Sequence, residues 1–252
     1  MCLVVIAWQA HPRYPLIVAG NRDEFHARPS TAAGWWPDAP AVLGGRDELA
    51  GGSWLAVNRN GRFAVVVNDP RRPPAAEQTL SRGQLVRDYV AGDRPSGRFL
   101  DMVAVNENRY AGFCLLLGTP VQVRGFVTAK GGAPHRWTMK PGVAAYSNGP
   151  IDEPAPKVAH MEREIAALLA RGEPDREAMF ALLASRVPVA AAEPGLSPLR
   201  LLPFVAGEDY GTRATTMLAI DERGRGEFEE RRFGPRGVPG GVTRERFEIS
   251  GR

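Results

Sequence analysis

The ten residues LIVAGNRDEF (16–25) begin as an apolar β-strand and end on an amide, a guanidinium group and two carboxylates. An earlier run, CLVVIAWQ (2–9), is also rich in β-branched and aromatic residues, and the turn-forming HPRYP (11–15) separates the two runs. A hairpin centred in that turn opposes residues whose numbers sum to roughly 24 or 25, and opposed side chains share one face of the sheet. The hairpin is therefore predicted to place Cys2 beside Arg22 or Asp23.

The rest of the chain is expected to add antiparallel strands and two groups of helices. A strand–turn–strand unit is predicted on either side of Arg59-Asn60-Gly61, and Ser81 is a predicted helix N-cap. Strands, then helices, then strands are typical of α+β layers rather than of a doubly wound sheet. One domain is expected over 1–252, with a loose Gly- and Arg-rich tail over 234–252. Further strands are expected over 113–117, 121–128, 143–147 and 212–233, and helices over 79–90, 97–106, 157–170 and 176–185.

Composition limits the classes of function. Apolar residues make up 44% and charged residues 24% of the 252, which is ordinary for a globular protein. The 32 basic residues are interspersed with 28 acidic ones, which indicates a solvated surface rather than a nucleic-acid site. The short apolar start matches neither a signal peptide nor a membrane span. With two cysteines and no Cys-x-x-Cys pair, the sequence favours a cytoplasmic protein, and the spacing of its four histidines predicts no metal site.

Cys2 has the chemistry of an N-terminal nucleophile. A small residue at position 2 permits removal of Met1, which leaves an α-amine of pKa about 8 beside a thiol of pKa about 8.5. Nucleophile and base then belong to one residue. Asp23 is placed to orient the amine, and Arg22 or a later arginine is expected to lower the pKa of the thiol. The alternative is structural: a cysteine in a buried strand is most often a small apolar residue, and Arg22 can equally well pair with a carboxylate.

Several motifs in order along residues 1–233 resemble one family. The start of the chain, MCLVVIAWQAHPRYPLIVAGNRDEF, is similar to the NRDE family of Transport-and-Golgi-organisation proteins, named for that Asn-Arg-Asp-Glu. The resemblance continues through VLGGRD, AGGSWLAVNRNGRFAVVVN, SRGQLV, AYSNGPID and YGTRATTMLAID. That family in turn resembles N-terminal-nucleophile (Ntn) hydrolases of the choloylglycine hydrolase and penicillin acylase branch. The resemblance implies a four-layer αββα sandwich of two antiparallel sheets.

The same resemblance implies roles for individual residues. Cys2 matches the nucleophile, and Asn21 and Asp23 match an Asn-x-Asp motif whose aspartate contacts the nucleophile's amine. The remaining matches are Asn68 and Asn148 at the oxyanion site and Arg213 near the nucleophile, with Arg22, Glu24 and Trp54 as supporting or binding residues. One position departs from the pattern, because the bile-salt branch has an arginine where this chain has Gly20.

Two functions follow as expectations. The first is hydrolysis of a C–N amide or related acyl bond in a small molecule, for which no cofactor is required. The alternative is a non-catalytic carrier of the same fold that binds haem, as in haem trafficking, or acyl-CoA or another lipid. Haem would then be a ligand held by one histidine or by Cys2. Removal of Met1 and the oligomeric state stay open, and the expected partner is a small molecule.

Overall fold

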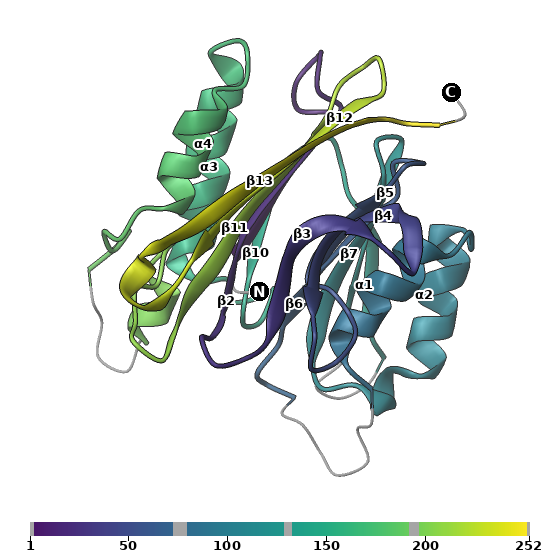
Figure 1. Cartoon of the computed structure of the whole chain (residues 1–252), viewed down its shortest axis with the longest axis horizontal. Coiled ribbons are helices and arrows are strands. Elements are labelled where there is room, and N and C mark those ends of the chain that lie inside the picture. The colour runs from purple at the N-terminus through teal and green to yellow at the C-terminus, as the bar shows by residue number, and fades with distance from the viewer. Residues whose placement is uncertain (1–2, 73–79, 129–132, 192–196, 251–252) are drawn as a thin grey trace.

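Two antiparallel β-sheets stack face to face between two pairs of helices in the computed structural model, which describes residues 3–72, 80–128, 133–191 and 197–250 (Figure 1). The six-stranded sheet of these residues has the spatial order β10 (Gly142–Ser147), β1 (Leu3–Trp8), β2 (Leu16–Phe25), β11 (Tyr210–Ile220), β12 (Arg225–Phe233) and β13 (Pro239–Glu248). The seven-stranded sheet has the order β3 (Ser30–Trp36), β4 (Ala39–Asp47), β5 (Leu55–Asn58), β6 (Phe63–Asn68), β7 (Phe113–Thr119), β8 (Gln122–Val127) and β9 (His135–Thr138).

Helices cover the outer face of each sheet. Helices α3 (Pro156–Ala170) and α4 (Arg176–Leu183) pack on the six-stranded sheet, and α1 (Arg82–Ala91) and α2 (Ser96–Val105) pack on the seven-stranded sheet. A third apolar core fills the space between the sheets. Because β1 is covered on both faces, all six of its residues are buried, which is why its sequence is a continuous apolar run. The described helices include none that is long and apolar enough to span a membrane.

The first hairpin has the predicted register. Leu3 pairs with Asn21 and Trp8 pairs with Leu16, so paired residue numbers sum to 24. Odd-numbered residues of β1 and β2, such as Val5 and Ala19, pack toward α3 and α4, whereas even-numbered ones, such as Val18, face the other sheet. This alternation decides on which side of the sheet each residue of the Asn-Arg-Asp-Glu segment lies.

The α+β prediction is confirmed, with differences in extent. The Arg59-Asn60-Gly61 turn joins β5 to β6, with Gly61 at a φ of 73°, and Ser81 caps α1 by accepting from the Gly83 N–H at 3.3 Å. The second strand is longer than the apolar run because β11 continues to pair with it as far as Phe25. The sequence analysis did not predict β3, β4 or β9.

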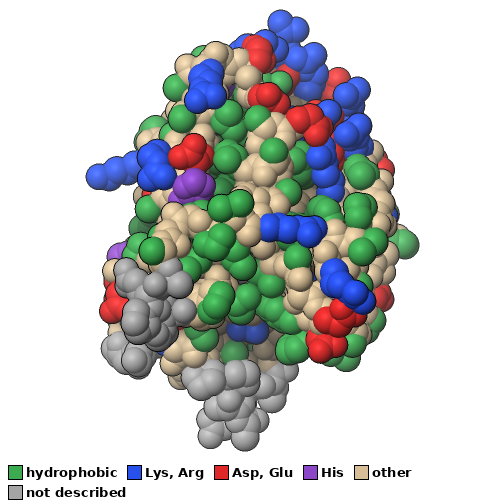
Figure 2. Space-filling view, turned by 90° about the vertical axis from the view of Figure 1, so that its left-hand side faces the viewer, with side chains coloured by type: hydrophobic (Ala, Val, Ile, Leu, Met, Phe, Trp, Pro, Cys, Tyr) green, Lys and Arg blue, Asp and Glu red, His purple; other side chains and the backbone are tan. Residues whose placement is uncertain are grey.

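The expectation of a loose tail is wrong for residues 239–248. These residues form β13, which pairs with β12 from Arg225–Glu248 to Phe233–Pro239. Its outward side chains are mostly exposed, so the sequence carries little apolar alternation, and the strand is held by its backbone pairing. Figure 2 shows one face of the molecule, on which basic and acidic side chains lie interspersed rather than separated by sign.

Candidate functional site between the two sheets

Asn21 ties the end of β2 to the helical layer. Its side chain is fully buried, and its Nδ2 donates to the carbonyl oxygens of Leu183 at 2.8 Å and Pro203 at 2.7 Å. Its Oδ1 accepts from the Thr215 hydroxyl at 2.7 Å. The amide thus fixes the sheet against the end of α4 and the segment before β11, which is a supporting role.

Asp23 lies two residues further on and projects from the same strand face. It exposes only 5% of its surface, and its Oδ1 accepts from the Thr212 hydroxyl at 2.6 Å. That hydroxyl in turn accepts from the Val205 N–H at 2.9 Å. The carboxylate therefore has a fixed position, set by a neighbouring strand rather than by solvent.

Arg22 projects from the opposite face of β2, into the space between the sheets. Its guanidinium carbon lies 4.5 Å from the centre of the Trp54 ring, a cation–π geometry, and only 4% of the residue is exposed. Burial lowers the pKa of Arg22 below its ordinary value. Gly20 precedes it on the same face, where an added Cβ would lie 2.5 Å from the carbonyl oxygen of Leu3. A side chain at position 20 would require the backbone of β1 to shift, and Arg22 is the arginine that β2 presents on this face.

Arg213 of β11 and Glu24 of β2 lie at the polar end of these two paired strands. A register shift between Thr212 and Ala214 turns Arg213 toward the carbonyl oxygens of Phe25, at 3.3 Å, and Arg28. Burial lowers the pKa of Arg213, and Glu24 opposes that effect. Glu24 also lies 3.8 Å from the Arg28 guanidinium. Arg213 therefore holds the 25–28 turn, and Glu24 shares a cluster of arginines with a second carboxylate, Asp47, which lies 2.8 Å from Arg28.

Two cavities flank the Arg22–Trp54 pair, and both are lined by residues of the two sheets. The Asn68 cavity, of about 100 Å³, is lined by Arg22, Glu24, Trp54 and Asn68, together with Arg82 of α1. The Glu230 cavity, of about 240 Å³, is lined by Arg22, Trp54, Arg213 and Glu230. The structure thus brings together five of the sequence-predicted site residues around one buried cation: Arg22, Glu24, Trp54, Asn68 and Arg213.

Asn148 lies in a different cavity from Asn68. It follows β10 and lines an apolar cavity of about 330 Å³ together with Trp137, Tyr146 and Val158. The preceding residue, Ser147, pairs with Leu3 at the start of β1. Burial raises the pKa of Tyr146 to about 12, so this phenol is neutral. Cys2, the predicted nucleophile, lies outside the described residues.

The sequence analysis missed Glu230, which is buried with 1% exposure in the wall of the Glu230 cavity. Its segment, EERRF (229–233), belongs to the interspersed charges that the composition assigns to a solvated surface. The available signal was the alternation of β12, because Phe228 belongs to the core between the sheets and Glu230 shares its face. The described residues contain no group of three His, Cys, Asp or Glu side chains arranged to hold a metal ion. Haem as a ligand stays a prediction.

Two antiparallel sheets between helical layers, with a polar site where the first strands end, define an Ntn-hydrolase fold. An N-acylethanolamine-hydrolyzing acid amidase ortholog from Caenorhabditis elegans superposes with a TM-score of 0.53 at 11% identity, over 86% of this chain and 92% of that one. A mutant of the conjugated bile acid hydrolase from Clostridium perfringens superposes with a TM-score of 0.56 at 10% identity, over 99% and 92%. At such low identity these likenesses show the fold alone.

The chain belongs to the Transport and Golgi organisation 2 family, whose model matches residues 1–235. The Transport and Golgi organization protein 2 homolog of Bos taurus is 29% identical over 257 residues, which cover 92% of each chain. The Drosophila melanogaster protein of the same name is 36% identical over 98 residues, which cover 36% of this chain and 35% of that one. These matches confirm the family and the fold that the motifs predicted.

Proposed function

We propose that the chain hydrolyses a C–N amide or related acyl bond of a small molecule, with Cys2 as the nucleophile. The Cys2 thiolate attacks the acyl carbon, and the α-ammonium group of the same residue protonates the departing amine. Water then attacks the thioester, which releases the carboxylic acid and restores the thiol. The scheme requires that Met1 be removed so that the α-amine is free, and it requires no metal or organic cofactor.

The register at the start of β1 carries this proposal. Leu3 pairs with Asn21 on one side and with Ser147 on the other, so both neighbouring strands reach the start of the chain. The next residues along those strands are Arg22 and Asn148. A nucleophile directly before Leu3 is therefore supported by the arrangement of its neighbours as well as by the family resemblance.

The supporting residues take the following roles in the proposal. Asp23, fixed by the Thr212 hydroxyl at 2.6 Å, orients the α-amine. Asn68 and Asn148 donate to the developing oxyanion, each contributing about 3 kcal/mol when well placed. They line different cavities, but β6, which ends at Asn68, and β10, which ends directly before Asn148, approach one another across the sandwich. Arg213 acts as a positioning residue through the carbonyl oxygens of Phe25 and Arg28.

The test compares two cysteines of the same chain. Intact mass spectrometry first determines whether Met1 is removed. Hydrolysis of N-acylethanolamines and conjugated bile acids, chosen after the superposed enzymes, is then followed by release of the free acid. Cys2→Ala should lower the rate roughly a thousandfold or more. Cys114→Ala is the matched control, because burial raises the pKa of Cys114 to about 12 and makes that thiol unreactive.

Equal turnover by Cys2→Ala and the unaltered chain would refute the proposed nucleophile. A chain that retains Met1 and still hydrolyses these amides would refute the α-amine as base. Each comparison requires that the variant be folded. The circular dichroism spectrum of each variant should therefore match that of the unaltered chain.

A carrier function is the second candidate, and the apolar cavity beside Asn148 favours it. Its walls of Trp137, Tyr146, Ile151 and Val158 suit an acyl chain or the edge of a flat aromatic ligand, and His135 is stacked on Trp137 with a ring-centroid distance of 5.4 Å. Long-chain acyl-CoA should then raise the melting temperature more than free CoA, and hemin should give a saturable Soret shift that depends on His135. A carrier would retain these responses in the Cys2→Ala chain.

A further inference from the structure

Three residues that line the Glu230 cavity each have a buried polar atom without a hydrogen-bond partner in the part of the chain that the structure describes. Arg22 Nη1, Trp54 Nε1 and Glu230 Oε2 form no hydrogen bond with any described residue, and the three residues are 4%, 6% and 1% exposed. All three line the same cavity. Buried polar groups in proteins are nearly always hydrogen-bonded, so three unpartnered groups around one cavity indicate a ligand rather than chance.

The three groups lie close together because of one glycine. A Cβ added at Gly45 would lie 2.2 Å from the Trp54 ring and 3.2 Å from Glu230 Oε2, so both side chains pack onto its backbone. The Arg22 guanidinium covers the same indole ring at 4.5 Å. Strands from both sheets thus contribute to one small polar surface.

Each of the three atoms is a donor. Arg22 and Trp54 have only N–H groups to offer. Glu230 Oε1 already accepts from the Ala33 N–H at 2.8 Å, and burial raises the pKa of this carboxyl group. The protonated form of Glu230, which burial favours, carries its proton on Oε2, the oxygen without a described partner. Arg213 and Arg232 also line the cavity and add positive charge, although Arg232 Nη1 lies 4.0 Å from Glu230 Oε1.

We propose that the Glu230 cavity binds the carboxylate group of a small organic acid, with Arg22, Trp54 and Glu230 donating to its two oxygens. A carboxylate accepts several hydrogen bonds and balances the arginine charge, whereas a neutral amide supplies one acceptor oxygen and no charge. The cavity volume of about 240 Å³ is below the roughly 300–1,000 Å³ of sites for drug-sized ligands. The site therefore takes a short acid or the carboxylate end of a longer one.

This inference does not use Cys2 and applies to a hydrolase and to a carrier alike. It is tested in the Cys2→Ala chain, so loss of catalysis and loss of the carboxylate site are separate results. The probes are acetate, butyrate, hexanoate and octanoate, the corresponding primary amides, and inorganic phosphate. Isothermal titration calorimetry and thermal shift should give saturable binding of the carboxylates only. Affinity that peaks at a short chain identifies a free short acid, and affinity that rises with length identifies the end of a fatty chain.

Matched variants assign the binding to these three donors. Trp54→Phe removes one N–H and keeps a ring, and it should weaken carboxylate binding roughly tenfold. Its control is Trp35→Phe, because the Trp35 Nε1 donates to Glu245 at 3.1 Å outside the cavity. Arg22→Met should weaken binding tenfold or more, and its control is Arg59→Met, because Arg59 covers Trp35 at 3.9 Å in the same geometry.

Two variants of Glu230 test most directly whether its side chain donates a hydrogen bond to the ligand. Glu230→Gln retains a donor in the place of Oε2 and should keep binding within about threefold, whereas Glu230→Leu should lose it. No saturable carboxylate binding, equal binding of the amides, or tighter binding of phosphate would each overturn the proposal. So would unchanged affinity in Trp54→Phe, a result that stands even where Arg22→Met fails to fold.

Discussion

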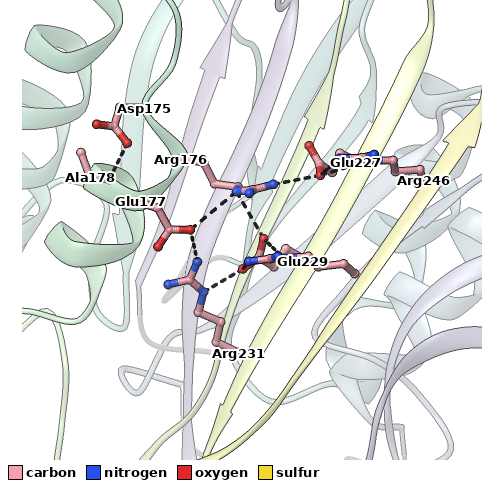
Figure 3. A network of polar contacts seen from close by, with 9 residues as sticks. Asp175, Arg176, Glu177, Ala178, Glu227, Glu229, Arg231 and Arg246 are labelled. Carbon is pink, nitrogen blue, oxygen red and sulfur yellow. Dashed lines mark hydrogen bonds and ion pairs between the residues drawn. The ribbon is translucent and has the colours of Figure 1, made fainter.

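Glu229 and Glu230 are adjacent on β12, and each exposes only 1% of its surface, yet their surroundings are opposite. Glu229 faces the α4 side of the sheet, where it accepts from Arg231 at 2.7 Å and Arg244 at 2.8 Å and lies 3.4 Å from Arg176 (Figure 3). Burial alone would raise the pKa of Glu229, but the hydrogen bonds from Arg244 and Arg231 hold it below the ordinary value.

Glu230 faces the space between the sheets, and its second oxygen has no described partner. Its pKa is raised by burial, and the charges of Arg232 and Arg22 only partly offset that effect. Equal burial thus gives two kinds of carboxyl group. The carboxylate satisfied by arginines stabilises the fold, and the carboxyl group whose second oxygen lacks a described partner is the one on which the proposed carboxylate site depends.

The largest expected effect on stability comes from removing the Glu229 carboxylate. Glu229→Ala leaves Arg231, Arg244 and Arg176 facing one another without their shared carboxylate. We expect a loss of about 3 kcal/mol in the free energy of unfolding, at the low end for a broken buried pair because the arginines are partly solvated. Urea denaturation measures it. Glu177→Ala, whose side chain is 63% exposed, is the control and should change stability by less than about 0.5 kcal/mol. An equal effect of both variants would mean that Glu229 is not the centre of the network.

A second prediction concerns the surroundings of Glu230, which Gly45→Ala should disturb. Gly45→Ala places a methyl group 2.2 Å from the Trp54 ring, so the indole must move away from Arg22 and Glu230. We expect the free energy of unfolding to fall by about 2 kcal/mol, as at other overpacked sites, and carboxylate binding to be lost. Gly34→Ala is the control, because an added Cβ there meets nothing within 4 Å. A stable Gly45→Ala chain with a full carboxylate response would show that the indole position does not matter.

Local periodicity predicted the layers of this fold more reliably than its edges. The apolar runs of β1 and β7 and the turn at Gly61 are local signals, and they gave the correct strands and hairpins. The edge strands β9 and β13 are largely polar, and the edge strand β3 buries only two of its seven residues. Such strands are held by the backbone of their neighbour rather than by a buried face. That pairing is a tertiary property, and no short window of sequence contains it.

The candidate site likewise has features that local sequence predicts and features that only the tertiary structure decides. The hairpin register, which depends only on a turn and a period of two, predicted that Arg22 or Asp23 lies beside the start of the chain. The observed pairing, with numbers that sum to 24, is what places Arg22 on the inner face. Arg22 of β2, Trp54 directly before β5 and Glu230 of β12 are far apart in the sequence and meet only at one cavity, so composition could not predict their association. Glu230 was missed because charged residues are usually solvated, and only its register with Phe228 placed it inside.

The smallest expected effect is a difference between Glu229 and Glu230 in how each makes stability depend on pH. The pKa of folded Glu230 lies above the ordinary 4.5, so the folded group holds its proton to a higher pH than the unfolded one. This group therefore lowers the free energy of unfolding as pH rises from 4.5 toward its folded pKa. Glu229, with its lowered pKa, has the opposite slope. Glu230→Gln removes the first slope, so we expect it to raise the free energy of unfolding by about 1 kcal/mol at pH 7 and by nothing measurable at pH 4. Urea denaturation at both pH values measures the difference. A variant that is instead less stable at pH 7 would mean that Glu230 is ionised and paired with Arg22 or Arg232, which removes the third donor from the carboxylate site.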